Sequence, residues 1–185
     1  MVEVLVTMLV LSIGLLGMAA LQLNGLRSVN SASYRTQATL LLSDIAERVR
    51  SNPTAVDNNL FMNIDSATNI NCGAFPATYC GEYYDGSGVV NAASCNSTQL
   101  ATYDVNVWFC GINAAGTRAG GVQAALPQAA ATISCIDTDP PAGADADICT
   151  DGSPHSISLS WTEVNPNKTA VNDTVVQTIA ITIQP

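Results

Sequence analysis

The sequence predicts an α+β fold in which a long N-terminal α-helix packs on a small antiparallel β-sheet and disulfide bonds hold the loops. Three observations lead to this prediction. No charged residue stands between Val4 and Leu23, and a helical pattern continues to Arg50. The last third of the chain alternates polar and apolar residues, as half-buried strands do. All six cysteines lie outside the predicted helix.

The predicted helix begins with an apolar segment, residues 1–26, that is long enough to cross a membrane. About 20 residues at about 1.5 Å rise each span the hydrocarbon core of a bilayer. Glu3 stands at the front of this segment, where a carboxylate is costly in lipid and needs a cationic partner or an interfacial position. We therefore expect Glu3 to be functional. Gly14 and Gly17 would allow close approach of a second helix, but glycine is also common in membrane helices, so their spacing leaves their role open.

Residues 27–53 are predicted to continue the same helix as an amphipathic half that covers its own domain. Pro53 should end the helix, because the residue before a proline is disfavoured in the α region. Asp44 and Arg48 have the spacing of an i,i+4 ion pair on the wetter side. The predicted apolar stripe consists of Leu26, Val29, Ala32 or Ser33, Thr36, Leu40, Ile45 and Val49, broadened by Leu41, Leu42 and Ala46. A helix over residues 1–51 would be about 77 Å long, which suits a subunit whose first half enters a shared core.

Residues 54–185 form the predicted globular domain. Its first part, residues 54–98, is rich in small polar residues and predicts loops held by disulfides, with a short helix near residues 56–62 and a turn at 85–88. Residues 100–108 fit a helix face, although residues 103–107 also alternate like a strand, and Trp108 is expected in the core. Strands are predicted at 131–136, 156–161 and 175–183, with a turn at 165–167.

Charge divides the chain unevenly. Its net charge is −9, and of its fifteen acidic residues only Glu3, Asp44 and Glu47 precede residue 52, whereas only Arg118 and Lys168 among its six basic residues follow. An acidic domain repels phosphate, so nucleic-acid binding by this domain is not expected. The arginines at 27 and 35 would by the positive-inside rule lie in the cytoplasm, but the cysteines favour the opposite orientation.

The cysteines indicate a disulfide framework in an oxidising compartment. A zinc site is not favoured, because the chain has no C-x-x-C motif and a single histidine. Six cysteines allow fifteen pairings, and their spacing leaves these open. The six are Cys72, Cys80, Cys95, Cys110, Cys135 and Cys149.

Other chemistry has little support. Five acids surround Cys149 in sequence, namely Asp137, Asp139, Asp145, Asp147 and Asp151. Calcium takes such oxygen ligands, but the spacing matches no EF-hand, so a solvated loop is favoured over a metal site. His155 follows Pro154 and is expected to be exposed in a turn rather than part of a Ser–His–Asp arrangement. No phosphate loop or nucleophile elbow occurs, so the sequence predicts neither an enzyme nor a cofactor.

The N-terminal residues carry a resemblance. The runs VEVLV (residues 2–6) and LSIGLLGMAALQ (residues 11–22) resemble the start of a type IV pilin, and more narrowly of a PilV-type minor pilin, also called a type IV pilus modification protein. The resemblance covers about residues 1–53. A weaker similarity returns at Leu126-Pro127, at Cys135 and at residues 156–161.

The resemblance implies the type IV pilin fold and several further properties. Glu3 would pair with the positive amino terminus of a neighbouring subunit, and a basic leader would precede the chain, with two more residues before Met1. The helix would lie in the inner membrane before assembly and in the core of an extracellular filament afterwards, with other pilin subunits as partners. Residues 100–108 would be helical and Cys135 would pair with Cys149; sequential pairing then gives Cys72–Cys80 and Cys95–Cys110.

By the same resemblance, the chain would prime pilus assembly, lie at or near the tip and support adhesion. A main filament subunit is the close alternative, and a type II secretion pseudopilin is a third member of the same class. The alternative from another class is a membrane-anchored extracellular binding module that holds calcium in its acidic loop.

Overall fold

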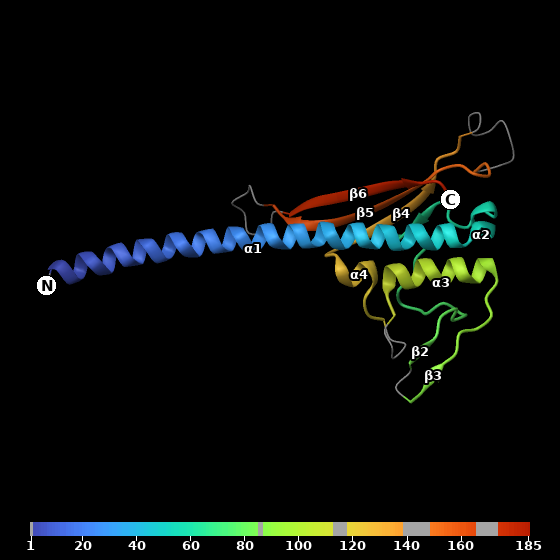
Figure 1. Ribbon diagram of the computed structural model, residues 1–185, viewed down its shortest axis with the longest axis horizontal. Coiled ribbons are helices and arrows are strands. Elements are labelled where there is room, and N and C mark those ends of the chain that lie inside the picture. Colours follow the sequence, from blue (N-terminus) through green and yellow to red (C-terminus); the bar gives the residue numbers. More distant parts are fainter. Residues whose placement is uncertain (1, 85–86, 113–117, 139–148, 166–173) are drawn as a thin grey trace. The chain divides into compact units, whose positions relative to one another are not determined.

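The computed structural model describes residues 2–84, 87–112, 118–138, 149–165 and 174–185. The chain divides into two compact units, Met1–Thr36 and Gln37–Pro185. The first unit is helical throughout its described length, and helix α1 (Val2–Ser51) extends from it into the second unit. All strands and the remaining helices belong to the second unit, which is therefore the globular part of the molecule (Figure 1).

Helix α1 ends where the sequence predicts. Asn52 leaves the helical conformation with φ −127° and ψ 65°, because Pro53 disfavours the α region at the residue before it. Pro53 then opens the short helix α2 (Pro53–Asp57), where its missing N–H costs no intrahelical hydrogen bond. The short helix was predicted near 56–62; α2 includes residues 56 and 57 of that range, and residues 58–63 form turns.

The buried stripe of α1 is shorter than predicted. It consists of Ala38, Leu42, Ile45, Ala46 and Val49, whose spacing follows the helical repeat. The predicted members Leu26, Val29 and Leu40 are wrong for the single chain, because each is more than 60% exposed. Ile45 and Val49 are confirmed, as are the broadening members Leu42 and Ala46. The buried stripe begins at Ala38, and Leu40 lies about 200° around the helix from it, on nearly the opposite side.

Residues 97–110 are helical, which decides the ambiguity that the sequence left between helix and strand. Helix α3 (Ser97–Cys110) begins with a capping box: Asn96 Oδ1 accepts from the Gln99 N–H, and the Gln99 side chain accepts from the Asn96 N–H. Trp108 is 2% exposed, as expected of a core residue.

Helix α3 ends at Gly111, where φ is 72° and a Cβ would collide with the backbone of Ala119 and Gly120. Only glycine allows this close turn toward helix α4 (Gly121–Ala125).

The main sheet has four antiparallel strands in the order β1-β4-β5-β6. The three C-terminal strands are predicted to within one residue at each end, except that β5 continues three residues beyond its predicted end at residue 161. The strands are β1 (Ile64–Asp65), β4 (Ala130–Cys135), β5 (His155–Val164) and β6 (Thr174–Ile183). Alternate residues of β5 are buried, so this strand lines the core with His155, Ile157, Leu159 and Trp161.

A second, two-stranded sheet pairs β2 (Tyr83–Tyr84) with β3 (Val89–Val90). The predicted turn at 85–88 lies between these strands, with residues 85–86 outside the described part. Within the globular unit, α1 from Gln37 onward lies between the four-stranded sheet and α3 (Figure 1). A long helix packed on a small antiparallel sheet with disulfides is consistent with the type IV pilin fold.

Candidate assembly surface

The apolar residues of the first unit are exposed on every side of the helix. All large apolar side chains from Val2 to Leu26 are 55–74% exposed. Helix α1 is long and apolar enough to cross a membrane, with a mean hydropathy of 2.5 in its most apolar window, none of which is buried in the chain. A contiguous apolar surface of this size marks a site for lipid or protein partners.

The two hydroxyl side chains of this segment form hydrogen bonds within the helix. The Thr7 hydroxyl donates to the Val4 carbonyl at 2.9 Å, and the Ser12 hydroxyl donates to the Met8 carbonyl at 2.7 Å. Such bonds leave no unpaired hydroxyl on the helix surface, as an apolar environment requires. The segment can therefore be buried in an apolar environment without leaving either hydroxyl group unpaired.

Glu3 is the charged exception in this segment. It lies exposed in the first turn of α1, where the positive end of the helix dipole favours a carboxylate. Among the described residues, the ion pairs all lie elsewhere, at Arg48 and Arg50. Its pairing with a neighbouring subunit therefore stays a prediction.

Gly14 and Gly17 lie on the exposed helix surface with open space around them. A Cβ added at either position would meet nothing within 4 Å in the single chain. The two glycines leave room for another helix, and their role in packing stays a prediction as well.

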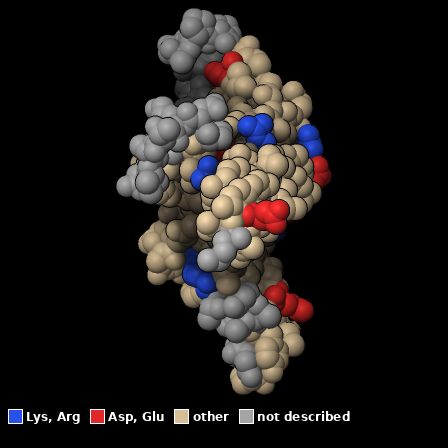
Figure 2. Space-filling view, turned by 90° about the vertical axis from the view of Figure 1, so that its left-hand side faces the viewer, with Lys and Arg blue, Asp and Glu red and all other residues tan. Residues whose placement is uncertain are grey.

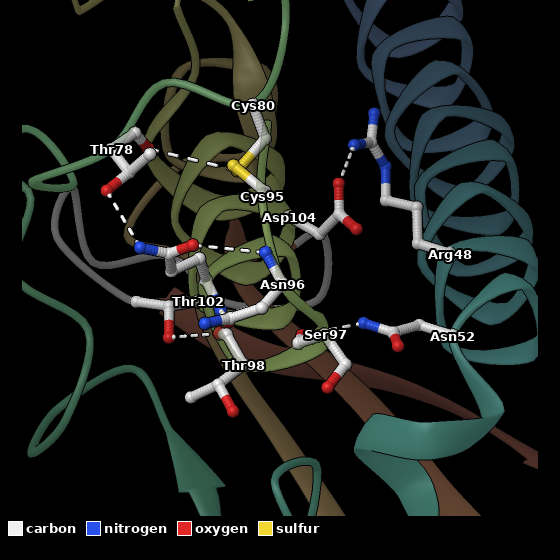
Figure 3. The surroundings of a disulfide bond; sticks show 11 residues. Arg48, Asn52, Thr78, Cys80, Cys95, Asn96, Ser97, Thr98, Thr102 and Asp104 are labelled. Atoms are coloured by element: carbon white, nitrogen blue, oxygen red, sulfur yellow. Dashed lines mark hydrogen bonds and ion pairs between the residues drawn. A yellow bond between two sulfur atoms is a disulfide. The ribbon is translucent and has the colours of Figure 1, made fainter. Parts of the chain in front are cut away.

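Helix α1 is fastened to α3 inside the globular unit by polar contacts between side chains that are far apart in sequence. Arg48 Nη1 donates to Asp104 Oδ1 at 2.8 Å, and Asn52 Nδ2 donates to the Ser97 carbonyl at 2.8 Å (Figure 3). The predicted pair of Arg48 with Asp44 is also present, at 3.1 Å. The Arg48–Asp104 contact was missed, because Asp104 stands in an apolar stretch whose partner lies 56 residues away.

Burial raises the pKa of Asp104 above its ordinary value. The neighbouring guanidinium of Arg48 opposes this shift but does not cancel it. Trp108 adds a further link, since its Nε1 donates to the Leu41 carbonyl at 2.8 Å. These contacts hold the C-terminal part of α1 in one orientation relative to α3.

Two disulfides hold the loops beside α3, and both correct the sequential pairing. Cys80 joins Cys95, and Cys72 joins Cys110. The predicted Cys72–Cys80 and Cys95–Cys110 bonds are wrong, because residues 80 and 95 flank the β2–β3 hairpin and are brought together by it. Cys72 therefore pairs with Cys110, the last residue of α3, at a Cα–Cα distance of 5.3 Å.

The third disulfide joins Cys135 to Cys149, the pairing that the resemblance implied. Of the five acids around it, Asp139, Asp145 and Asp147 lie outside the described residues. Asp137 Oδ1 accepts hydrogen bonds from the Thr150 hydroxyl at 3.0 Å and backbone N–H at 3.3 Å, while Asp151 is exposed. One of the described acids, Asp137, thus links residues 137 and 150 through hydrogen bonds.

His155 corrects a prediction. It was expected to be exposed in a turn, but it is the first residue of β5 and is 1% exposed. Its Nδ1 lies 3.1 Å from the Ser153 carbonyl, and burial lowers its pKa. The prediction was wrong because Pro154 was interpreted as part of a turn that includes His155, whereas β5 begins directly after the proline.

Charged side chains are sparse over the visible face in Figure 2. Among the described residues on that face, acids and bases lie singly or in small groups between uncharged side chains. This face therefore presents no broad charged patch among its described residues.

The geometry defines a class of protein: a long exposed apolar helix joined to a compact, disulfide-bonded α+β unit. Residues 20–106 match the model of the Tt1218-like family, described as type IV pilin Tt1218. This match supports the type IV pilin superfamily and, with it, a structural subunit that assembles with other pilins. Neither the comparison with curated proteins nor that with solved structures found a match.

The family match and the apolar helix fit a chain that is anchored in a membrane and then enters a pilus filament.

Proposed function

We propose that this chain is a minor pilin of the PilV-like kind, which primes pilus assembly or lies at the tip and supports adhesion. Its apolar helix would lie in the inner membrane before assembly and in the filament core afterwards. The globular unit would face outward, in an oxidising compartment that preserves its three disulfides. The similarity of residues 2–22 to PilV-type pilins supports this narrower assignment.

The observation that carries the proposal is the exposure of the apolar helix on all sides. Full burial of one large apolar side chain contributes about 1.5–3 kcal/mol. Summed over the apolar residues between Val2 and Leu26, the gain from covering this surface is on the order of tens of kcal/mol, as an upper estimate. Lipid can cover the helix before assembly, and copies of similar helices can cover it in a filament.

Glu3 would supply the register between subunits. A carboxylate inside an apolar core is tolerated when a cation lies against it, and the amino terminus of an adjacent subunit is such a cation. This pairing would also select one axial step between subunits, because a displaced carboxylate would be left unpaired. The role is assembly and involves no catalysis.

A direct test is quantitative mass spectrometry of sheared, purified surface filaments. A trace amount of this chain, with a processed N-terminal peptide, supports a minor pilin. About one copy per subunit repeat would make it the main filament subunit instead. Absence from filaments would favour a membrane-anchored binding module and overturn the proposal.

A matched pair of variants tests the role of Glu3. Glu3→Ala should remove the chain from filaments while leaving it in the membrane, since the globular unit does not include residue 3. Glu47→Ala is the control, because Glu47 is an exposed acid on the same helix, paired with Arg50 at 2.8 Å. Equal incorporation of both variants would refute the role assigned to Glu3.

A further inference from the structure

The buried end of the main sheet brings together three side chains that can bind metal. Cys135 of β4 lies directly opposite His155 of β5 in the strand register. Cys149 joins them through its disulfide to Cys135. One ligand atom from each of the three residues lies within 4.8 Å of the other two. His155 and Cys149 are buried, and Cys135 is partly exposed.

The hydrogen bond of His155 selects its tautomer. Nδ1 lies 3.1 Å from the Ser153 carbonyl, which can only accept, so Nδ1 carries the proton. Nε2 then presents a lone pair, and it is buried without a hydrogen-bond partner among the described residues. A histidine that donates one N–H to a backbone carbonyl and offers its other nitrogen has the arrangement found in metal sites.

We propose that the dithiol form of this chain binds Zn²⁺ through Cys135, Cys149 and Nε2 of His155. The disulfide form lacks thiolates and does not bind the metal. A phosphine reductant supplies two electrons to the S–S bond and takes up the oxygen atom of water, whose two protons complete the two thiols. Zn²⁺ then displaces both thiol protons and takes two thiolates and one neutral imidazole, with water in its fourth position.

The geometry of the cluster suits this ion. Zn–S bonds of about 2.3 Å and Zn–N bonds of about 2.0 Å at tetrahedral angles place the ligand atoms about 3.5–3.8 Å apart. The ligand atoms lie within 4.8 Å of one another, so small rotations of the two cysteine side chains would complete the site. The β4–β5 pairing fixes the backbone of Cys135 and His155. Zinc would thus link the same two cysteines before their disulfide forms.

The other four cysteines provide a control within the molecule. The chain has one histidine, so neither Cys72–Cys110 nor Cys80–Cys95 has an imidazole beside it. The proposal therefore predicts protection of one cysteine pair out of three.

The experiment uses the full chain in detergent micelles. A phosphine first reduces all three disulfides and becomes the phosphine oxide, whose oxygen atom comes from water. The phosphine is then removed. The reduced chain is incubated with or without equimolar Zn²⁺ and pulsed with iodoacetamide, and alkylation at each cysteine is measured by mass spectrometry. We expect Zn²⁺ to slow alkylation of Cys135 and Cys149 at least tenfold relative to the other four cysteines. Equal alkylation of all six, or equal protection of all six, overturns the proposal.

Two substitutions separate a ligand from a packing residue. His155→Leu fills the site but removes the nitrogen, so protection of Cys135 and Cys149 should be lost. His155→Cys restores a zinc ligand and should restore protection. Protection that persists in His155→Leu overturns the proposal. In the wild-type chain, Co²⁺ in place of Zn²⁺ should add a thiolate charge-transfer band in the near ultraviolet, and the absence of this band would count equally against the site.

Discussion

Removal of the Arg48 guanidinium should destabilise the globular unit far more than removal of its neighbour Arg50. Arg48 Nη1 lies 2.8 Å from Asp104 Oδ1, and the two side chains are 32% and 9% exposed. Arg48→Met keeps most of the aliphatic stem and deletes the charge. Asp104 then remains as a largely buried carboxylate without its cation.

The expected cost at pH 7 is about 2–4 kcal/mol in the free energy of unfolding. Breaking a fully buried ion pair on one side costs about 3–5 kcal/mol, and the partial exposure of Arg48 reduces this figure. Arg50→Met is the matched control. Arg50 makes an ion pair of the same 2.8 Å length with Glu47, but the side chains are 44% and 73% exposed, so its loss should cost less than about 1 kcal/mol.

Chemical denaturation followed by tryptophan fluorescence measures both variants, because Trp108 and Trp161 are at most 2% exposed and change environment on unfolding. Burial raises the pKa of Asp104, and loss of Arg48 raises it further, so protonation relieves the unpaired charge and the cost should shrink as the pH falls toward 4. Arg48→Met combined with Asp104→Asn should recover part of the loss at pH 7. Equal costs for the Arg48 and Arg50 variants, or no recovery in the double variant, would refute the reasoning.

Three further predictions concern the same unfolding transition. Gly111→Ala should cost more than 3 kcal/mol, because the added Cβ meets backbone at a positive φ, whereas Gly120→Ala, also at positive φ but with open space, should cost about 1–2 kcal/mol; equal costs would contradict the steric account. Trp108→Phe should cost about 1–2 kcal/mol through loss of its hydrogen bond to Leu41 and part of its volume, and an unchanged midpoint would contradict this. Burial lowers the pKa of His155, so below about pH 6.5 the unfolded chain binds more protons and stability falls by up to about 1.4 kcal/mol per pH unit; His155→Gln should flatten this slope, and an unchanged slope would count against it.

The sequence predicted the elements whose signals are local. Pro53 marks the end of α1 because its effect on the preceding residue needs no distant partner. The alternation in β5 and β6 identifies these strands because they pair with each other along their whole length, and β5 buries one face while β6 partly buries one. Even the choice between helix and strand at residues 103–107 has a local basis, since Asn96 and Gln99 form a capping box just upstream.

Features that depend on distant parts of the chain were not predicted. The pairing of Cys72 with Cys110 depends on where α3 ends relative to a loop 38 residues earlier. The burial of His155 depends on its pairing with Cys135 in the sheet. Pro154, the residue before it, suggests a turn and gives no sign of this pairing. Among the candidate site residues, Glu3 could be chosen from its position alone, but its partner lies in another molecule under the proposed function.

The errors in the apolar stripe of α1 follow a pattern that bears on this function. Leu26, Val29 and Leu40 have helical spacing but are 62–65% exposed in the single chain. An apolar periodicity records every surface that a helix buries, whether against its own chain or against another molecule. If the chain is a filament subunit, these residues are the ones that neighbouring subunits should cover. The mismatch between sequence pattern and single-chain burial then identifies an assembly surface that reaches beyond the membrane-length segment, at least as far as Leu40.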